Sequence, residues 1–255
     1  MENNDFKVDI ILTSPPYGSS RKVSESYKDF DMHDVHGSHS RYDVFDDCMS
    51  VDEYLQFTHR IFKDFDKILK PNGVILYNIN YSAFSWEYAK GFFDTLSMIN
   101  NTNFVIADTI TWKKTNALPI QSHNKMSRIC EFIFVICRKH EYKTFKTNKK
   151  VSSVYKNEQF FEHVTNFVEA KNNDGMCKLN RACFSTDMVM QLLQKYCYSK
   201  DCIVYDPFMG TGTTANACIK YGCNYLGTEL SQAQCEYAEN RLQKTLEMVN
   251  MSEDW

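Results

Sequence analysis

The chain has 255 residues, 43% of them hydrophobic, and a formal net charge of -3 from 29 basic and 32 acidic side chains. This length suits a single α/β domain over residues 1–255 with a substantial core, and the charge gives no overall sign of a nucleic-acid partner. No stretch approaches the ~20 apolar residues of a membrane span or the layout of a signal peptide, so we expect a soluble cytoplasmic protein with no membrane partner.

The first half of the chain predicts alternating strands and helices. Val8 to Leu12 is typical of a central strand, and residues 18–50 form a long polar loop. Apolar residues at helical spacing predict a helix over 53–69, with Asp52 as its N-cap and Pro71 to Gly73 as its stop. Further elements are expected at 73–79 (strand), 85–96 (helix), 104–112 (strand) and 129–136 (strand).

The second half begins with an insertion and continues with a strand and helix series. Residues 138–178 match no element of a common core. The expected elements after them are a helix over 187–198, a strand over 202–206, a helix from 213, a strand over 224–228 and a final helix that Ser231 caps.

The strand over 202–206 ends in a carboxylate and is followed by a glycine turn. The sequence there is Asp206-Pro207-Phe208-Met209-Gly210-Thr211-Gly212-Thr213-Thr214. The two glycines allow close approach to the backbone, and the threonines after them can begin a helix. Glu229, at the end of the next strand, can accept hydrogen bonds from ribose hydroxyls. A ribose-bearing cofactor therefore fits.

Other interpretations compete for this turn. Gly210-x-Gly212-x-x-Ala215 also fits the dinucleotide fingerprint of NAD-dependent oxidoreductases, and a glycine turn can simply close a strand and helix unit. The Asp206 carboxylate separates the two cofactor classes, because it would repel a pyrophosphate and attract an ammonium group. S-adenosylmethionine carries an ammonium group, so it is the cofactor that we expect.

A rigid turn follows the first strand. Ser14-Pro15-Pro16-Tyr17 contains two prolines that fix two φ angles and bias Ser14 toward an extended conformation. The Ser14 hydroxyl and the Pro15 carbonyl can then accept both protons of an exocyclic amino group on a nucleobase. Tyr17 can stack on that base once it has left the duplex. The alternative is a proline-bracketed loop with one exposed tyrosine.

Together the two motifs resemble those of the amino-methyltransferases of DNA, which methylate cytosine N4 or adenine N6. The family's (D/N/S)-P-P-(Y/F/W) and F-x-G-x-G signatures match Ser14 to Tyr17 and Phe208 to Gly212, in the order of the circularly permuted β group. The resemblance implies a Rossmann-like S-adenosylmethionine-dependent methyltransferase fold with a mixed, mostly parallel sheet flanked by helices. It also implies that Asp206 and Thr213 contact the methionine part of the cofactor and that Glu229 contacts its ribose.

These arguments define the expected site. The expected catalytic residues are Ser14, Pro15, Pro16 and Tyr17. The expected cofactor-binding residues are Asp206, Pro207, Phe208, Gly210, Gly212, Thr213, Thr214 and Glu229, and no metal is expected.

The sequence departs from the family in two places. Residues 1–7 precede Val8, where members usually have a further strand and helix, and residues 178–186 replace a stretch that is often rich in histidine and proline. A homodimer mate or another chain could supply the missing element. Alternatively, the chain is a non-catalytic nucleic-acid-binding subunit with a methyltransferase fold.

The identity of the base rests on Ser14. Serine in this position is more frequent in the cytosine-N4 group and aspartate in the adenine-N6 group, although both side chains can accept an amino proton. We therefore favour cytosine N4 in double-stranded DNA and keep adenine N6 as the alternative. An RNA methyltransferase is a third possibility, and a cognate restriction endonuclease is a candidate partner.

Target recognition is assigned to insertions at 18–50 and 138–178. Residues 138–150 interleave basic and aromatic side chains, which suits phosphate tracking, although a solvated connector has the same composition. His33, His36 and His39 have no cysteine to complete a familiar metal pattern. The 10 cysteines include no Cys-x-x-Cys pair and indicate reduced, mostly buried thiols.

Overall fold

The computed structural model describes residues 6–16, 44, 49–80, 86–117, 119, 123–124, 126–175, 179 and 183–253, with the backbone alone for 86–91 and 252–253. Most of the loop predicted over 18–50, including its three histidines, lies outside the described residues. Tyr17 lies outside them as well.

A seven-stranded sheet forms the centre of the molecule, in the order β7-β3-β4-β2-β1-β8-β9. The strands are β1 (Val8–Thr13), β2 (Leu69–Ile79), β3 (Phe104–Lys114), β4 (Cys130–Arg138), β7 (Phe167–Ala170), β8 (Ile203–Asp206) and β9 (Asn224–Gly227). Strand β4 is antiparallel to both of its neighbours, and the other four pairs are parallel. The prediction of a mixed, mostly parallel sheet is confirmed.

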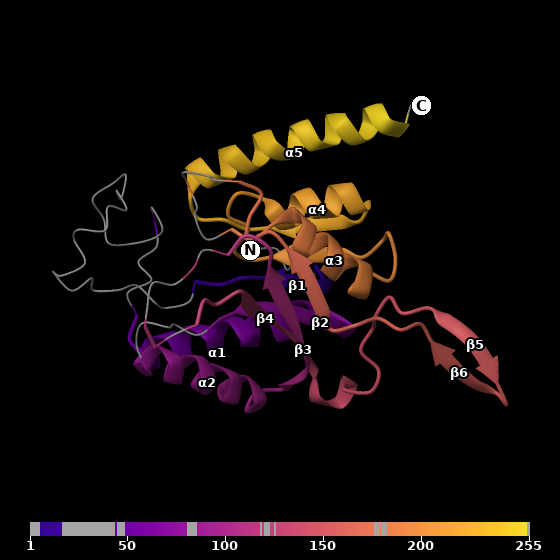
Figure 1. Ribbon diagram of the computed structural model, residues 1–255, viewed down its shortest axis with the longest axis horizontal. Coiled ribbons are helices and arrows are strands. Elements are labelled where there is room, and N and C mark those ends of the chain that lie inside the picture. The colour runs from indigo at the N-terminus through magenta and orange to yellow at the C-terminus, as the bar shows by residue number, and fades with distance from the viewer. Residues whose placement is uncertain are drawn as a thin grey trace.

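Helices cover both faces of the sheet (Figure 1). The helices are α1 (Val51–Ile68) and α2 (Trp86–Asn100) on one face, and α3 (Thr186–Tyr196), α4 (Thr213–Tyr221) and α5 (Gln232–Glu253) on the other. Among the described residues, none of the helices combines the length and the apolarity needed to cross a membrane.

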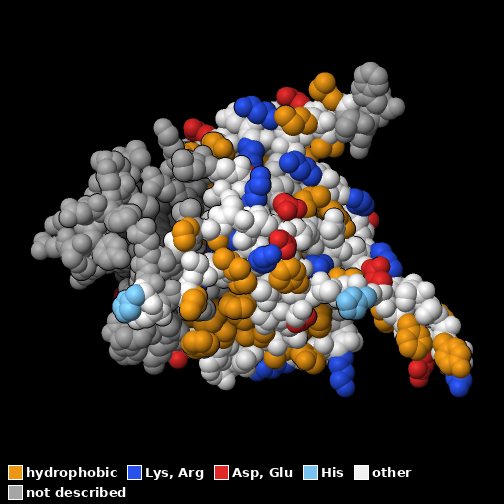
Figure 2. Space-filling view, in the orientation of Figure 1, with side chains coloured by type: hydrophobic (Ala, Val, Ile, Leu, Met, Phe, Trp, Pro, Cys, Tyr) orange, Lys and Arg blue, Asp and Glu red, His pale blue; other side chains and the backbone are white. Residues whose placement is uncertain are grey.

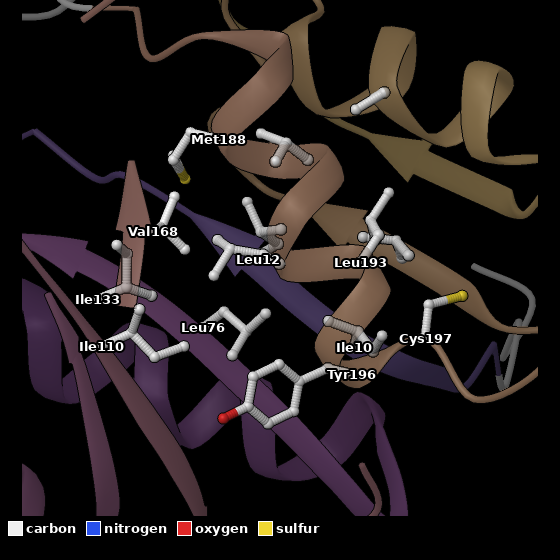
Figure 3. Close-up of a cluster of buried hydrophobic side chains, with 14 of the residues drawn as sticks. Ile10, Leu12, Leu76, Ile110, Ile133, Val168, Met188, Leu193, Tyr196 and Cys197 are labelled. Atoms are coloured by element: carbon white, nitrogen blue, oxygen red, sulfur yellow. The ribbon is translucent and has the colours of Figure 1, made fainter. Parts of the chain in front are cut away.

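The core between the sheet and α3 holds the strands of the site in place. Met188 and Leu193 of α3 are fully buried in the same cluster as Ile10 and Leu12 of β1 (Figure 3). Val168 of β7 lies in this cluster too, so the last part of the predicted insertion belongs to the core. Because β1 is buried along its whole length, it provides a rigid base for the turn that follows it.

Two predictions about α1 were wrong. The N-cap is Ser50 rather than Asp52, because the Ser50 hydroxyl accepts from the Glu53 N–H (3.3 Å) while a Glu53 carboxylate oxygen accepts from the Ser50 N–H (2.8 Å). Pro71 to Gly73 do not stop the helix, since the chain already turns extended at Leu69 and β2 begins there. The register between β1 and β2 shifts between the pairs Val8–Leu69 and Ile10–Val74. Pro71, which has no N–H to donate, lies in this irregular part of the strand pair, where a proline is tolerated.

Residues 138–178 contain a two-stranded hairpin that extends away from the body of the molecule (Figure 1). It consists of β5 (Val151–Tyr155) and β6 (Glu158–Phe161), joined through Lys156 and Asn157, which both have positive φ as a type I′ turn requires. Every residue of both strands is exposed. Figure 2 shows hydrophobic rings on this projection, and the exposed large apolar residues are Val151, Val154, Tyr155, Phe160 and Phe161.

Candidate active site

The two predicted motifs lie next to each other at one edge of the sheet. Strands β1 and β8 are parallel neighbours, with Ile10 opposite Val204 and Ile11 opposite Tyr205. Their carboxyl ends, Thr13 and Asp206, are therefore adjacent, and the two turns leave the sheet side by side. This edge of parallel strands is where open α/β sheets bind ligands.

Asp206 is the centre of a buried hydrogen-bond network. Its Oδ1 accepts from the Thr13 hydroxyl (2.8 Å) and from the Phe208 N–H (3.0 Å), and its Oδ2 accepts from the Thr214 hydroxyl (2.6 Å). The side chain is 1% exposed, and this burial raises the pKa of Asp206 to about 6 although the three donors lower it. The charge of Glu229 contributes to the same increase in the pKa of Asp206. Asp206 is thus a carboxylate that is costly to ionise without a nearby cation.

The glycine turn adopts the backbone that its sequence predicts. Gly210 and Gly212 have φ of 55° and 79°, in the left-handed region. A Cβ on Gly212 would also lie 3.0 Å from the Cβ of Ala238 on α5, so any other residue would be strained in its backbone and crowded against α5. Gly212 is the N-cap of α4, and none of the described side chains caps this end. The first N–H groups of α4 therefore point toward the site edge.

Glu229 organises the neighbouring loop. Its Oε2 accepts from the Gly210 N–H (2.8 Å), and its Oε1 accepts from the N–H groups of Leu230 (2.9 Å) and Ser231 (3.0 Å). One carboxylate therefore joins the glycine turn after β8 to the start of α5. A ribose hydroxyl at Glu229 would have to share these oxygens, so the predicted ribose contact stays a prediction.

The Ser14-Pro15-Pro16 turn continues directly from the sheet. Pro15 and Pro16 are buried and Ser14 is half-buried, while Thr13 before them is fully buried. The backbone of the turn is thus packed as well as restricted by the two rings. Of the remaining predicted residues, Phe208 packs on Phe57 of α1 at 6.1 Å between ring centroids.

A family model described as DNA methylase, of the N6/N4 type, matches residues 8–240. The chain belongs to the DNA methylase family. Its relatives include the type II methyltransferase M.HinfI of Haemophilus influenzae, 28% identical over 93% of this chain and 63% of that protein. The type II methyltransferase M.MthZI of Methanothermobacter thermautotrophicus is 21% identical over 98% of this chain and 75% of that protein. This chain thus spans less than two thirds of the length of M.HinfI.

Solved structures with this fold include PvuII DNA methyltransferase, described as cytosine-N4-specific, and a complex of M1.HpyAVI with S-adenosylmethionine. The first has a TM-score of 0.65 and 17% identity, covering 96% of this chain and 86% of that one. The second has a TM-score of 0.56 and 21% identity, covering 93% and 89%. These likenesses confirm the predicted methyltransferase fold, and the family match confirms the predicted membership of the DNA amino-methyltransferase family.

Two residues that the sequence did not single out support the glycine turn. Arg241 of α5 donates to the Thr211 carbonyl (3.3 Å) and to the Thr213 hydroxyl (3.1 Å), and it forms an ion pair with Asp174. Thr213, predicted to touch the cofactor, is 5% exposed and uses its hydroxyl as an acceptor here. Asp174 lies in the segment treated as an insertion, so no local motif signalled this contact.

The basic stretch at 138–150 lies at the other end of the sheet. Arg138 donates to a carboxylate oxygen of Asp66 (2.6 Å) and to the Leu69 carbonyl (2.8 Å) at the start of β2. The Lys146 N–H bonds the Asn72 carbonyl (2.9 Å) nearby. The six residues of β1 separate this end from the two turns by ~20 Å. Arg138 therefore has a structural role, and phosphate contacts from this stretch would lie far from the turns.

Proposed function

We propose that this chain transfers a methyl group from S-adenosylmethionine to the exocyclic amino group of a base in double-stranded DNA. The observation that supports this most directly is the contact between Thr13 and Asp206, 2.8 Å apart, at the adjoining ends of β1 and β8. A cofactor at the glycine turn and a base at the Ser14-Pro15-Pro16 turn would then be neighbours. Such positioning supplies much of the acceleration when two reactants must meet in line.

The cofactor side has the groups that S-adenosylmethionine needs. Asp206 Oδ2 accepts one hydrogen bond, which leaves it an acceptor site for an N–H of the cofactor's ammonium group. The glycine turn offers backbone N–H groups at the start of α4. Glu229 lies beside this turn, where its carboxylate would accept hydrogen bonds from the ribose hydroxyls. When bound, S-adenosylmethionine supplies an electrophilic methyl group on a positive sulfur. The remaining predicted cofactor contacts, from Pro207, Phe208 and Thr214, belong to the same proposal.

The base side would act by accepting hydrogen bonds. The Ser14 hydroxyl and the Pro15 carbonyl would accept hydrogen bonds from the two amino N–H groups, so that the nitrogen lone pair turns out of the ring and toward the methyl group. The new N–C bond would form as the S–C bond breaks, and the methylated nitrogen would then release one proton to solvent. A separate strong base is unnecessary in this arrangement. We propose that Tyr17 stacks on the flipped base and offsets part of the few kcal/mol of unstacking.

We favour cytosine N4 over adenine N6 because Ser14 occupies the first position of the motif. Nucleoside mass spectrometry tests both the reaction and the base. Unmethylated plasmid DNA is incubated with the protein and S-adenosylmethionine deuterated in its methyl group, and labelled N4-methylcytosine is expected. Labelled N6-methyladenine would support the adenine alternative.

The Ser14→Ala variant is the matched control, because it should still bind cofactor but lose most turnover. Wild-type protein that binds cofactor and labels RNA instead of DNA would reassign the substrate. Wild-type protein that binds no cofactor at millimolar concentration would contradict the proposal and favour a non-catalytic DNA-binding subunit.

We propose that the insertions at 18–50 and 138–178 contribute to DNA recognition, and that the β5–β6 hairpin is the contacting part of the second. The hairpin leaves the end of the sheet opposite the two turns, so it would contact the duplex at a distance from the flipped base. Its exposed aromatic residues and Lys156 at its tip suit contact with nucleic acid. Replacing Phe160 and Phe161 by serine should weaken DNA binding while cofactor affinity stays unchanged. Equal DNA affinity of variant and wild type would remove the hairpin from the recognition surface.

We also propose that a second copy or another chain covers the outer edge of β9. This strand is last in the sheet order, and its four residues are all exposed. Sedimentation of the purified protein tests for the homodimer. We propose a cognate restriction endonuclease as the functional partner. Methylation of the DNA site would prevent that endonuclease from cleaving it.

A further inference from the structure

The two motifs of the site are joined by one oxygen atom. Asp206 Oδ1 accepts from the hydroxyl of Thr13, the last residue of β1, and from the N–H of Phe208, the first part of the glycine turn. The other oxygen of the same carboxylate accepts from Thr214 in the first turn of α4. Thr13, Asp206 and Thr214 are at most 1% exposed, so water does not compete for these hydrogen bonds.

Thr13 has a side chain that the fold does not otherwise require. Its backbone is already placed by the pairing of β1 with β2, where it lies opposite Tyr77. Its Cβ substituents are in the core, where valine of nearly the same shape would fit, yet the hydroxyl is aimed at Asp206. The next three residues, Ser14, Pro15 and Pro16, follow Thr13 with little conformational freedom.

We propose that Thr13 is a positioning residue that fixes the Ser14-Pro15-Pro16 turn relative to the glycine turn through Asp206 Oδ1. The inference rests on the proposed function, in which the two turns hold the base and the cofactor. Reacting atoms must come within ~3–3.5 Å and in line, and a displacement of ~1 Å can lower the rate ~100-fold. A hydrogen bond between the ends of the two motif-bearing strands controls that distance directly.

The main test compares Thr13→Val, which removes the hydroxyl, with Thr13→Ser, which keeps it. Methyl transfer to unmethylated plasmid DNA is measured in a single turnover at saturating S-adenosylmethionine, and cofactor affinity is measured by calorimetry. Thr13→Val should lower the single-turnover rate on the order of 10–100-fold, whereas Thr13→Ser should keep a rate close to that of the wild type. Cofactor affinity should change by less than about threefold, well below the effect on rate.

Thr214→Val distinguishes the loss of the Thr13–Asp206 hydrogen bond from a general effect on the Asp206 carboxylate. It also removes one hydroxyl from that carboxylate, but Thr214 lies on α4 and does not contact β1 through this bond. Its effect on the rate should therefore be clearly smaller than that of Thr13→Val. Equal rate losses, or a Thr13→Val loss that appears wholly in cofactor affinity, would overturn the proposal.

Thr58→Val is the control for the chemical change itself. Thr58 is fully buried in α1, and its hydroxyl has no hydrogen-bond partner among the described residues. The same substitution there should leave the rate unchanged. An equal loss at Thr58 would mean that threonine-to-valine changes in this core act through general packing, which would contradict the specific role of Thr13.

A second measurement separates this inference from the proposed function. If the wild type labels no DNA, the proposed function fails, but the link is still tested by the pH dependence of apo stability. Loss of a donor from Thr13 should raise the pKa of Asp206 further, so Thr13→Val should shift the associated stability change to higher pH, as Thr214→Val should. Glu229 is the charged group acting on Asp206 and is unchanged in both. No shift in Thr13→Val would overturn the link.

Discussion

Asp206→Asn should stabilise the apo protein near neutral pH while it weakens cofactor binding. Asparagine has nearly the shape of aspartate but no charge, and the hydroxyls of Thr13 and Thr214 can rotate to meet its amide. Burial raises the pKa of Asp206 to about 6, from 3.8 for an unburied aspartate. The folded protein therefore binds the proton more tightly than the unfolded chain, and stability falls as pH rises between these values.

The size of the effect follows from that difference in pKa. At ~1.4 kcal/mol for each pH unit, ionised Asp206 lowers the free energy of unfolding by about 3 kcal/mol above pH 6. About 2 kcal/mol of this develops between pH 4.5 and 7.5. The difference in stability between Asp206→Asn and wild type should grow by that amount over this range. Lost or altered hydrogen bonds add an offset that does not depend on pH.

Urea unfolding of both apo proteins across this pH range is the assay. Asp9→Asn is the control, since Asp9 is also buried but accepts from Lys70, Tyr198 and the Ile203 N–H, and its difference in stability from the wild type should stay constant between pH 4.5 and 7.5. Burial acts to raise the pKa of Asp9, but these donors lower it overall, so Asp9 stabilises the fold above pH ~4 and the contribution fades below. Parallel stability curves for Asp206→Asn and wild type would refute the reasoning.

Three further outcomes are expected. Gly212→Ala should lose about 1–3 kcal/mol of stability and most of its cofactor affinity, as measured by calorimetry. Gly222→Ala is the control, because Gly222 has the same φ of 79° at the other end of α4; it should lose stability but keep its cofactor affinity. Arg241→Ala should lower the melting temperature and weaken cofactor binding, because the Thr211 carbonyl and Thr213 lose their donor; unchanged affinity would separate α5 from the site. Cofactor affinity of the wild type should fall as pH drops below about 6, where Asp206 becomes protonated, and a flat profile from pH 5 to 8 would argue against an ammonium contact.

Local chain chemistry explains why many predictions succeeded. Apolar runs identified β1, β2, β4 and β8 because central strands of a sheet that helices cover on both faces need apolar residues on both faces. Ser231 was correctly predicted to cap the last helix, as its hydroxyl accepts from the Gln234 N–H (3.3 Å). At α1 two capping residues were available two positions apart, and the reciprocal bond with Glu53 favoured Ser50 over Asp52. The hairpin was missed because its turn residues, Lys156 and Asn157, contain no glycine.

The sequence by itself determined the chemistry of each motif, since proline rings, glycine torsions and a carboxylate at a strand end are properties of adjacent residues. The tertiary structure alone decided how the motifs combine. Thr13 and Asp206 are 193 residues apart, and their hydrogen bond exists because the sheet order places β1 beside β8. Similarly, the packing of α5 brings Arg241 to the glycine turn, and the antiparallel direction of β4 carries the basic stretch to the far end of the sheet. Such contacts depend on how elements distant in the chain pack, which no local pattern encodes.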